Sequence, residues 1–246
     1  MNKKKFSLIV YENVKTLLGA LIIAILIRSF LFQPFYIPSS SMEPTLLVGD
    51  RIFVSKYAYG FSKHSFPFSP DFSSNRFFSK PPETGDLVVF KTPADNRTDY
   101  IKRLIGQPGD SIQFINGDLY INDSKVNKEK IINTDLIRCG NFNLKTDYFI
   151  ETLPNGVKHL TVYKKSGSLQ NTKKFNVPEN HFFLMGDNRD CSKDSRYLNS
   201  VGYVNFINLV GKARVIFFSN DTKKSTLLKF WNLKKSFRLE RLFKRL

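Results

Sequence analysis

An uncharged run near the N-terminus, residues 17–27, constrains this chain more than any other feature of its sequence. The predicted span covers residues 14–33, provided that Lys15 and Arg28 extend their charges to the two membrane surfaces. A helix needs about 20 residues to cross a bilayer. Because only helices and closed barrels satisfy their backbone polar groups in lipid, we expect one N-terminal transmembrane helix.

The flanks of this run distinguish a retained anchor from a cleaved leader sequence. A cleavage site would bring small residues at alternate positions, whereas the segment that follows, residues 33–38, reads Gln-Pro-Phe-Tyr-Ile-Pro and is bulky. We therefore expect the anchor to be retained. The lysines of the basic segment 1–13 favour a cytoplasmic N-terminus, which places everything after residue 33 on the outer side.

The net charge of +17 raises the question of a nucleic-acid partner, so its distribution along the chain matters. Residues 1–15 carry +3 and residues 222–246 carry +8, which leaves +6 for the 206 residues between them. Basic ends on a mildly basic body are typical of contact with an anionic membrane. We therefore expect membrane phospholipid, and no nucleic acid, as a partner.

Beyond the anchor the sequence favours strands, in short alternating or β-branched runs separated by turn signals such as Asn116-Gly117. These runs are residues 51–59, 86–91, 100–105, 111–115, 118–121, 157–163, 181–185 and 213–218. The pattern predicts a mainly β fold in which a sheet-rich core carries an inserted β-rich domain. The expected parts are the core (34–112 and 180–221), the insertion (113–179) and a basic amphipathic tail (222–246).

The tail has two interpretations. Apolar residues recur in it at helical spacing among lysines and arginines, which is typical of a helix lying in the membrane interface. A surface helix that packs on the body of the protein has the same pattern. The sequence does not distinguish these alternatives, but the charge density excludes a second spanning helix.

Ser41 lies in a cluster of three serines between Pro38 and Pro44, which fix the backbone on both sides. Met42 and Leu46 supply apolar neighbours. Serine clusters between prolines are more often loops or helix caps, so a catalytic interpretation needs a second residue.

Lys102 is a candidate for that second residue. A lysine has a pKa of about 10.4, so using its free base at neutral pH costs about 4 to 5 kcal/mol. Burial lowers the pKa by disfavouring the charged form, and a neutral amine can then accept the proton of an attacking hydroxyl. Arg103, the next residue of the same predicted strand, would point to the opposite face. A lysine in a strand is, however, usually a solvated side chain.

A third stretch, residues 186–197, reads Gly-Asp-Asn-Arg-Asp-Cys-Ser-Lys-Asp-Ser-Arg-Tyr. Its alternating carboxylates are compatible with a calcium loop, but the EF-hand spacing with its final glutamate is missing. A polar loop held together by aspartate–arginine pairs is the other structural interpretation.

In their order along the chain, these stretches resemble the motif boxes of the bacterial type I signal peptidases, or leader peptidases. The resemblance covers residues 28–46, 85–90, 100–110 and 186–197, while the insertion and the two ends match only in general character. Two positions depart from the family pattern: Ser40 stands where many members have glycine, and Cys191 where many have asparagine.

By this resemblance, Ser41 is the nucleophile and Lys102 the general base. Ser39 would donate its hydroxyl, beside the Ser41 backbone amide, to the oxyanion of the tetrahedral intermediate. Ser192 would orient the Lys102 amine.

The resemblance also implies two structural ion pairs in the third stretch, Asp187 with Arg196 and Asp194 with Arg103. Further residues match positions that line the family's shallow pockets for small side chains before the scissile bond. They are Phe35, Ile37, Leu46, Tyr100 and Ile101.

The expected protein is therefore a serine endopeptidase of the inner (plasma) membrane, with its catalytic domain on the periplasmic or outer side. It would remove N-terminal signal peptides from exported preproteins after small-x-small sequences. The phenylalanine-rich residues 61–78 are a candidate for contact with phospholipid. No cofactor or metal is implied, because His64, His159 and His181 sit in no ligand or triad pattern.

Three alternatives belong to other classes of protein. The self-cleaving repressors of the SOS response share a serine–lysine pair but lack an anchor and carry a DNA-binding head. A membrane-tethered binding protein would not need Lys102, and a Ser-His-Asp hydrolase would need a histidine in a motif. The two cysteines, Cys139 and Cys191, can pair in an oxidising compartment, but their spacing leaves the pairing open.

Overall fold

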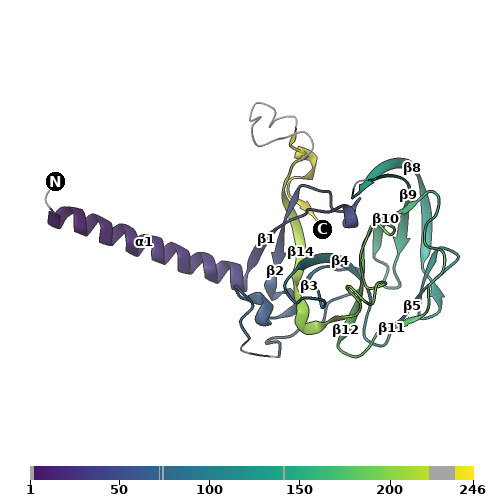
Figure 1. Ribbon diagram of the computed structural model, residues 1–246, viewed down its shortest axis with the longest axis horizontal. Helices are drawn as coiled ribbons and strands as arrows, with labels where there is room; N and C mark the ends of the chain where they lie inside the picture. The colour runs from purple at the N-terminus through teal and green to yellow at the C-terminus, as the bar shows by residue number, and fades with distance from the viewer. Residues whose placement is uncertain (1–2, 72, 74, 141, 222–235) are drawn as a thin grey trace.

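The computed structural model describes residues 3–71, 73, 75–140, 142–221 and 236–246. One long helix, α1 (Lys3–Phe30), extends away from a body made of strands (Figure 1). Its segment Val10–Phe30 has a mean hydropathy of 1.8, and its most apolar window is not buried in the protein. The helix therefore has the length and composition of the predicted membrane span.

The body is organised around one large antiparallel sheet, in the order β1-β2-β14-β3-β4-β12-β13, with β15 paired to β14. Its strands are β1 (Phe32–Tyr36), β2 (Asp50–Ser55), β3 (Leu87–Lys91), β4 (Asp99–Gly106), β12 (His181–Met185), β13 (Val204–Asn205), β14 (Leu209–Ser219) and β15 (Lys244–Arg245).

Both faces of this sheet are covered, as the strand β3 shows. Successive side chains of a strand point to opposite faces. Leu87 and Val89 belong to one apolar cluster with Met42 and Leu46, whereas Val88 and Phe90 belong to a second cluster on the other face. A strand buried on both faces reads as the continuous apolar run Leu-Val-Val-Phe in the sequence.

The residues between β4 and β12 form two smaller sheets on one side of the body (Figure 1). One sheet has the order β11-β5-β6-β7 and the other β10-β9-β8. Their strands are β5 (Ser111–Ile115), β6 (Asp118–Ile121), β7 (Ser124–Lys125), β8 (Asn127–Cys139), β9 (Phe142–Thr152), β10 (Lys158–Lys164) and β11 (Phe175–Asn176). A third apolar cluster joins these sheets to Phe183 and Met185 of β12.

Short 3-10 helices connect several strands. They are η1 (Ser40–Met42), η2 (Lys56–Tyr59), η3 (Lys63–Ser65), η4 (Phe206–Asn208) and η6 (Leu239–Arg241). The first of them, η1, follows β1 directly, so the serine cluster is attached to an edge strand of the large sheet.

The mainly β fold predicted from the sequence is confirmed, and every predicted run contains a strand. The long hairpin of β8 and β9 was not predicted, because its lysines, asparagines and threonines do not produce a clear apolar alternation. The division into domains stays a prediction.

The predicted helix of the tail is wrong for the part of the tail that the structure describes; residues 222–235 lie outside it. Leu239–Arg241 form a 3-10 turn and Lys244–Arg245 a strand on β14. The physical reason is tertiary: the buried Arg241 donates to the Asp50 carboxylate at 2.6 Å, and Leu246 packs against the core. Arg241 and Leu246 therefore attach the end of the chain to the body, while Leu239 and Phe243 are exposed.

Candidate active site

Ser41 is held in η1 by contacts on its backbone. The amide of Asn188 donates to the Ser41 carbonyl at 3.1 Å, and the Asn188 side chain donates to the Ser40 carbonyl at 3.2 Å. Met42 is fully buried beneath the turn. The serine hydroxyl is therefore fixed between the chain that follows β1 and the loop that follows β12.

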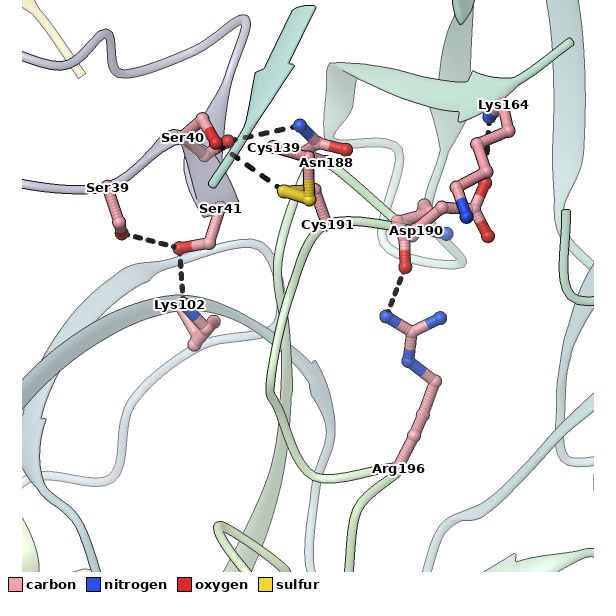
Figure 2. The surroundings of a disulfide bond; sticks show 11 residues. Ser39, Ser40, Ser41, Lys102, Cys139, Lys164, Asn188, Asp190, Cys191 and Arg196 are labelled. Atoms are coloured by element: carbon pink, nitrogen blue, oxygen red, sulfur yellow. Dashed lines mark hydrogen bonds between the residues drawn. A yellow bond between two sulfur atoms is a disulfide. The ribbon is translucent and has the colours of Figure 1, made fainter. Parts of the chain in front are cut away.

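Lys102 lies on β4 and points at this serine (Figure 2). Its Nζ donates to Ser41 Oγ at 2.6 Å and to the Ile101 carbonyl at 3.0 Å. Only 4% of the residue is exposed, and no carboxylate in the described part of the chain lies within ion-pair distance of the amine. A buried lysine without an anionic partner is a poor structural element but a good candidate base.

The surroundings of Lys102 change its acidity. Burial lowers the pKa of Lys102 from 10.5 to about 8, while the carboxylates of Asp194 and Asp187 act in the opposite direction. At pH 7 a group with this pKa is neutral in about one molecule in ten, compared with fewer than about one in a thousand for an ordinary lysine. The amine can therefore accept a proton near neutral pH.

Ser39 and Ser192 have different relations to this pair. Ser39 Oγ lies 3.3 Å from Ser41 Oγ, so the two hydroxyls share one site (Figure 2). Ser192 Oγ is buried and helps to lower the pKa of Asp194, but no described residue forms a well-aligned hydrogen bond with it. The structure therefore does not contain the expected hydrogen bond from Ser192 to the Lys102 amine, and its orienting role stays a prediction.

Gly186, at the end of β12, has no room for a side chain. A Cβ placed there would overlap the Ser41 carbonyl oxygen and the Ser192 hydroxyl. Three segments that are distant in the sequence therefore meet within contact distance at this glycine.

A groove of about 400 Å³ opens beside the pair of Ser41 and Lys102. Four of the five residues predicted to line a substrate site do line it: Phe35, Ile37, Tyr100 and Ile101. Ile52 and Val89 also line the groove, although no sequence motif marks them. The register could have identified Val89, because it lies opposite Ile101 in the pairing of β3 with β4.

The prediction that Leu46 lines the groove is wrong. Leu46 is fully buried in the apolar cluster with Met42 and is not among the residues that line the groove. Its amide donates to the Met42 carbonyl at 2.9 Å, which closes a turn and directs the leucine into the core. Leu46 therefore supports the wall from behind.

The predicted partners of the two ion pairs are wrong, because the structure exchanges them. Arg103 donates to both carboxylate oxygens of Asp187 at 2.8 and 2.7 Å, and Arg196 donates to both oxygens of Asp194 at 2.8 Å. Arg103 points away from Lys102, to the face where Thr45 also donates to Asp187 at 2.5 Å. Arg103 therefore binds Asp187, whose carboxylate lies on the face of β4 opposite Lys102.

Both aspartates are ionised in this arrangement. Burial would raise the pKa of each carboxyl, but the guanidinium of Arg103 lowers that of Asp187 and the guanidinium of Arg196 lowers that of Asp194 below the usual value. The charges of this loop therefore form a fixed structural unit.

A further buried network, missed in the sequence, connects this loop to the smaller sheets. Arg189 donates to both carboxylate oxygens of Glu151 at 2.8 and 2.6 Å, and Tyr163 donates to the same carboxylate at 2.6 Å. His159 lies beside them, and burial lowers its pKa to about 4, so it is neutral. Glu151 and His159 lie on β9 and β10, in the part of the sequence between the motif boxes, so no local pattern marks them.

A disulfide joins Cys139, at the end of β8, to Cys191 (Figure 2). The sequence left this pairing open. The bridge lies next to the serine cluster, with Cys191 Sγ at 3.5 Å from Ser40 Oγ. It attaches the hairpin of β8 and β9 to the loop that carries Ser192.

Comparison with known proteins gives one consistent result. Residues 10–218 match the family model described as signal peptidase, peptidase S26. The signal peptidase I of Rickettsia typhi is 42% identical over 245 residues, which is 91% of this chain and 89% of that protein. The signal peptidase I of Rickettsia prowazekii is also 42% identical, with the same coverage of both chains.

Among solved structures, a crystal structure of a signal peptidase I from Enterococcus faecalis V583 is 27% identical to this chain. It covers 54% of this chain and 97% of its own length, with a TM-score of 0.32.

Proposed function

Because the chain belongs to the S26 signal peptidase family and is a serine endopeptidase of the signal peptidase I type, we propose that Ser41 and Lys102 are its catalytic pair. The hydrogen bond of 2.6 Å between Lys102 Nζ and Ser41 Oγ is the observation that carries this proposal. The substrate would be an exported preprotein, cut after a small-x-small sequence at the end of its signal peptide.

The reaction would begin with transfer of the Ser41 proton to the neutral Lys102 amine as the hydroxyl oxygen attacks the scissile carbonyl. The oxyanion would be stabilised by the Ser41 amide and the Ser39 hydroxyl, which lies 3.3 Å from Ser41 Oγ. When the peptide bond breaks, the Lys102 ammonium would donate its proton to the leaving amine of the mature chain. The signal peptide would remain as an ester on Ser41.

Water would release the signal peptide in the second half of the reaction. Lys102, neutral again, would accept a proton from that water as it attacks the ester. The proton would then return to Ser41 Oγ, which leaves as the alcohol. One lysine thus supplies and removes the proton in both halves.

The groove supports a preference for small side chains in the signal peptide. The apolar residues Ile37, Met42 and Ile101 line the groove beside Ser41 and Lys102, and Val89 of β3 lines it as well. We expect this apolar lining to favour small apolar side chains of the substrate over charged ones. A substrate in an extended conformation would place alternate side chains on this apolar lining.

We propose that α1 anchors the chain in the inner (plasma) membrane, with the N-terminus in the cytoplasm and the body on the outer side. The length and exposure of the segment Val10–Phe30 support the anchor, and Lys3, Lys4 and Lys5 support the orientation. The Cys139–Cys191 disulfide is an independent argument, because disulfides persist in oxidising compartments outside the cytosol.

Phospholipid would also contact the body, through the phenylalanine-rich loop of residues 61–78. Rings of this loop pack on Phe30 at the end of α1, with centroids at 5.4 Å for Phe61 and 5.5 Å for Phe66. Phe68 is fully exposed and Phe78 is 89% exposed. If serine at positions 66, 68, 77 and 78 leaves lipid-stimulated cleavage unchanged, this contact is wrong.

The catalytic proposal is tested with the full-length protein in detergent and a preprotein that carries a small-x-small site. The expected result is a single cut after that site by the wild type, and none by Ser41→Ala. The exposed Ser124 on β7 provides a matched control, since Ser124→Ala makes the same change outside the groove. Residual cutting by a folded Ser41→Ala variant would show that another residue is the nucleophile.

A further inference from the structure

Lys193 lines the same groove as Ser41 and Lys102, and neither the sequence motifs nor the proposed reaction uses it. Its side chain is exposed, and its ammonium forms no hydrogen bond or ion pair with the residues that the structure describes. The other charged lining residues are engaged. Asp99 pairs with Lys91 at 2.9 Å, and Lys102 is buried against Ser41.

The backbone that carries Lys193 is fixed at several points. The preceding Cys191 is bonded to Cys139, and the following Asp194 is held by Arg196. Asp190 also accepts hydrogen bonds from the amides of Lys164 and Leu169, at 2.8 and 3.2 Å. Because this backbone is already fixed, only the Lys193 side chain has to be ordered when a ligand binds, which lowers the entropic cost of the contact.

The two strands beside the groove give it a direction. Strand β1 runs towards Ser41 and β4 runs towards Lys102, so Phe35 and Asp99 mark the end far from the pair. Cys191 lies at the other end, 3.5 Å from Ser40. In the proposed reaction the signal peptide occupies the strand side. The residues after the scissile bond must therefore leave past Cys191 and Lys193.

We propose that Lys193 is a specificity-determining residue that favours an acidic side chain in the first residues after the scissile bond. This inference rests on the proposed function. An exposed ion pair of this kind changes affinity by about two- to fivefold and weakens as the salt concentration rises. This preference concerns residues after the scissile bond. It is therefore independent of the proposed preference for small residues before the bond.

The test uses peptides that are identical up to the scissile bond and carry Asp, Asn or Lys at the first, second or third position after it. With the full-length protein in detergent at low salt, kcat/KM for the Asp peptide should exceed that for the Asn peptide by about two- to fivefold at one position. The Lys peptide should be the slowest. Lys193→Glu should reverse the order of the Asp and Lys peptides.

The control is Lys158→Glu, the same charge change on the exposed face of β10, outside this groove. It should keep the wild-type order of the peptides. The inference is overturned if Lys193→Glu, shown by circular dichroism to be folded, ranks the peptides as the wild type does. Failure of the wild type to cut even the Asn peptide would instead overturn the proposed function, and this inference with it.

Discussion

Two buried lysines, Lys102 beside Ser41 and Lys56 beneath the turn η3, have the same acidity and different partners. Burial lowers the pKa of each to about 8. Lys102 donates to a hydroxyl, Ser41 Oγ, at 2.6 Å and also to the Ile101 carbonyl, whereas the two acceptors of Lys56, His64 and Ser65, are both carbonyls at 3.1 Å. A hydroxyl can give up a proton and a carbonyl cannot. The acceptor, and not the lowered pKa, therefore distinguishes a candidate base from a structural lysine.

The site of Lys56 is consistent with a structural role. Its backbone amide donates to the Leu31 carbonyl at the end of α1, while its side chain closes the turn at residues 62–65. Lys56 therefore connects the end of the apolar helix to the phenylalanine-rich loop. It lies in the part of the molecule proposed to be nearest to the membrane.

The largest expected difference between the two lysines is in activity. If the proposed pair is correct, Lys102→Met should lower kcat/KM by about a thousandfold or more, because the proposed nucleophile Ser41 loses its base. Lys56→Met should change kcat/KM by less than about threefold, since it leaves the groove intact. Cleavage of one preprotein by both purified variants measures this. Equal losses in the two variants would mean that the lysines act only through folding.

The dependence of activity on pH should further distinguish Lys102 from Lys56. Since Lys102 can act as the proposed base only when it is neutral, kcat/KM should rise about a hundredfold between pH 6 and pH 9 and level off above its pKa of about 8. Lys56→Met should have the same profile, although its own pKa is also about 8. If the midpoint of the pH profile moves in Lys56→Met, the titration belongs to Lys56, and its assignment to Lys102 is wrong.

The smallest expected effect is on stability. Below pH 8 the folded protein holds a buried Lys102 ammonium, so Lys102→Met should raise the free energy of unfolding by about 1 to 3 kcal/mol at pH 7. Between pH 8 and about 10.4 the unfolded state binds the extra proton, so wild-type stability rises with pH and the gain disappears.

For Lys56→Met the change should be smaller, because two carbonyls lose their donor and offset the removal of the charge. Denaturant titrations at pH 7 and pH 10 measure both variants. A destabilised Lys102→Met at pH 7 would contradict this account.

The sequence predicted the central pair of this site but not the arrangement around it. Motif boxes identified Ser41 and Lys102, and strand alternation correctly sent Arg103 to the opposite face. The partners of Arg103 and Arg196 were exchanged because Asp187 and Asp194 lie in one loop. The conformation of that loop decides which of the two carboxylates reaches Arg103 on β4, and local sequence does not determine this conformation.

Contacts from the smaller sheets were the least predictable. Glu151 and His159 reach the loop after β12 from strands that carry no motif, and their pairing depends on the packing of β9 and β10. The pairing of Cys139 with Cys191 could not be predicted for the same reason, because Cys139 lies at the end of a hairpin whose position the sequence does not determine. Local patterns predict elements and local chemistry; long-range packing decides the partners.

Gly186 has a consequence for reading related sequences. Since its missing side chain leaves the space that the Ser41 carbonyl and the Ser192 hydroxyl occupy, any larger residue there must push these groups apart. A relative that keeps both the serine and the lysine but has alanine or a larger residue at this glycine is expected to be a pseudoenzyme. This glycine can thus indicate a loss of activity in a relative that keeps both residues of the proposed catalytic pair.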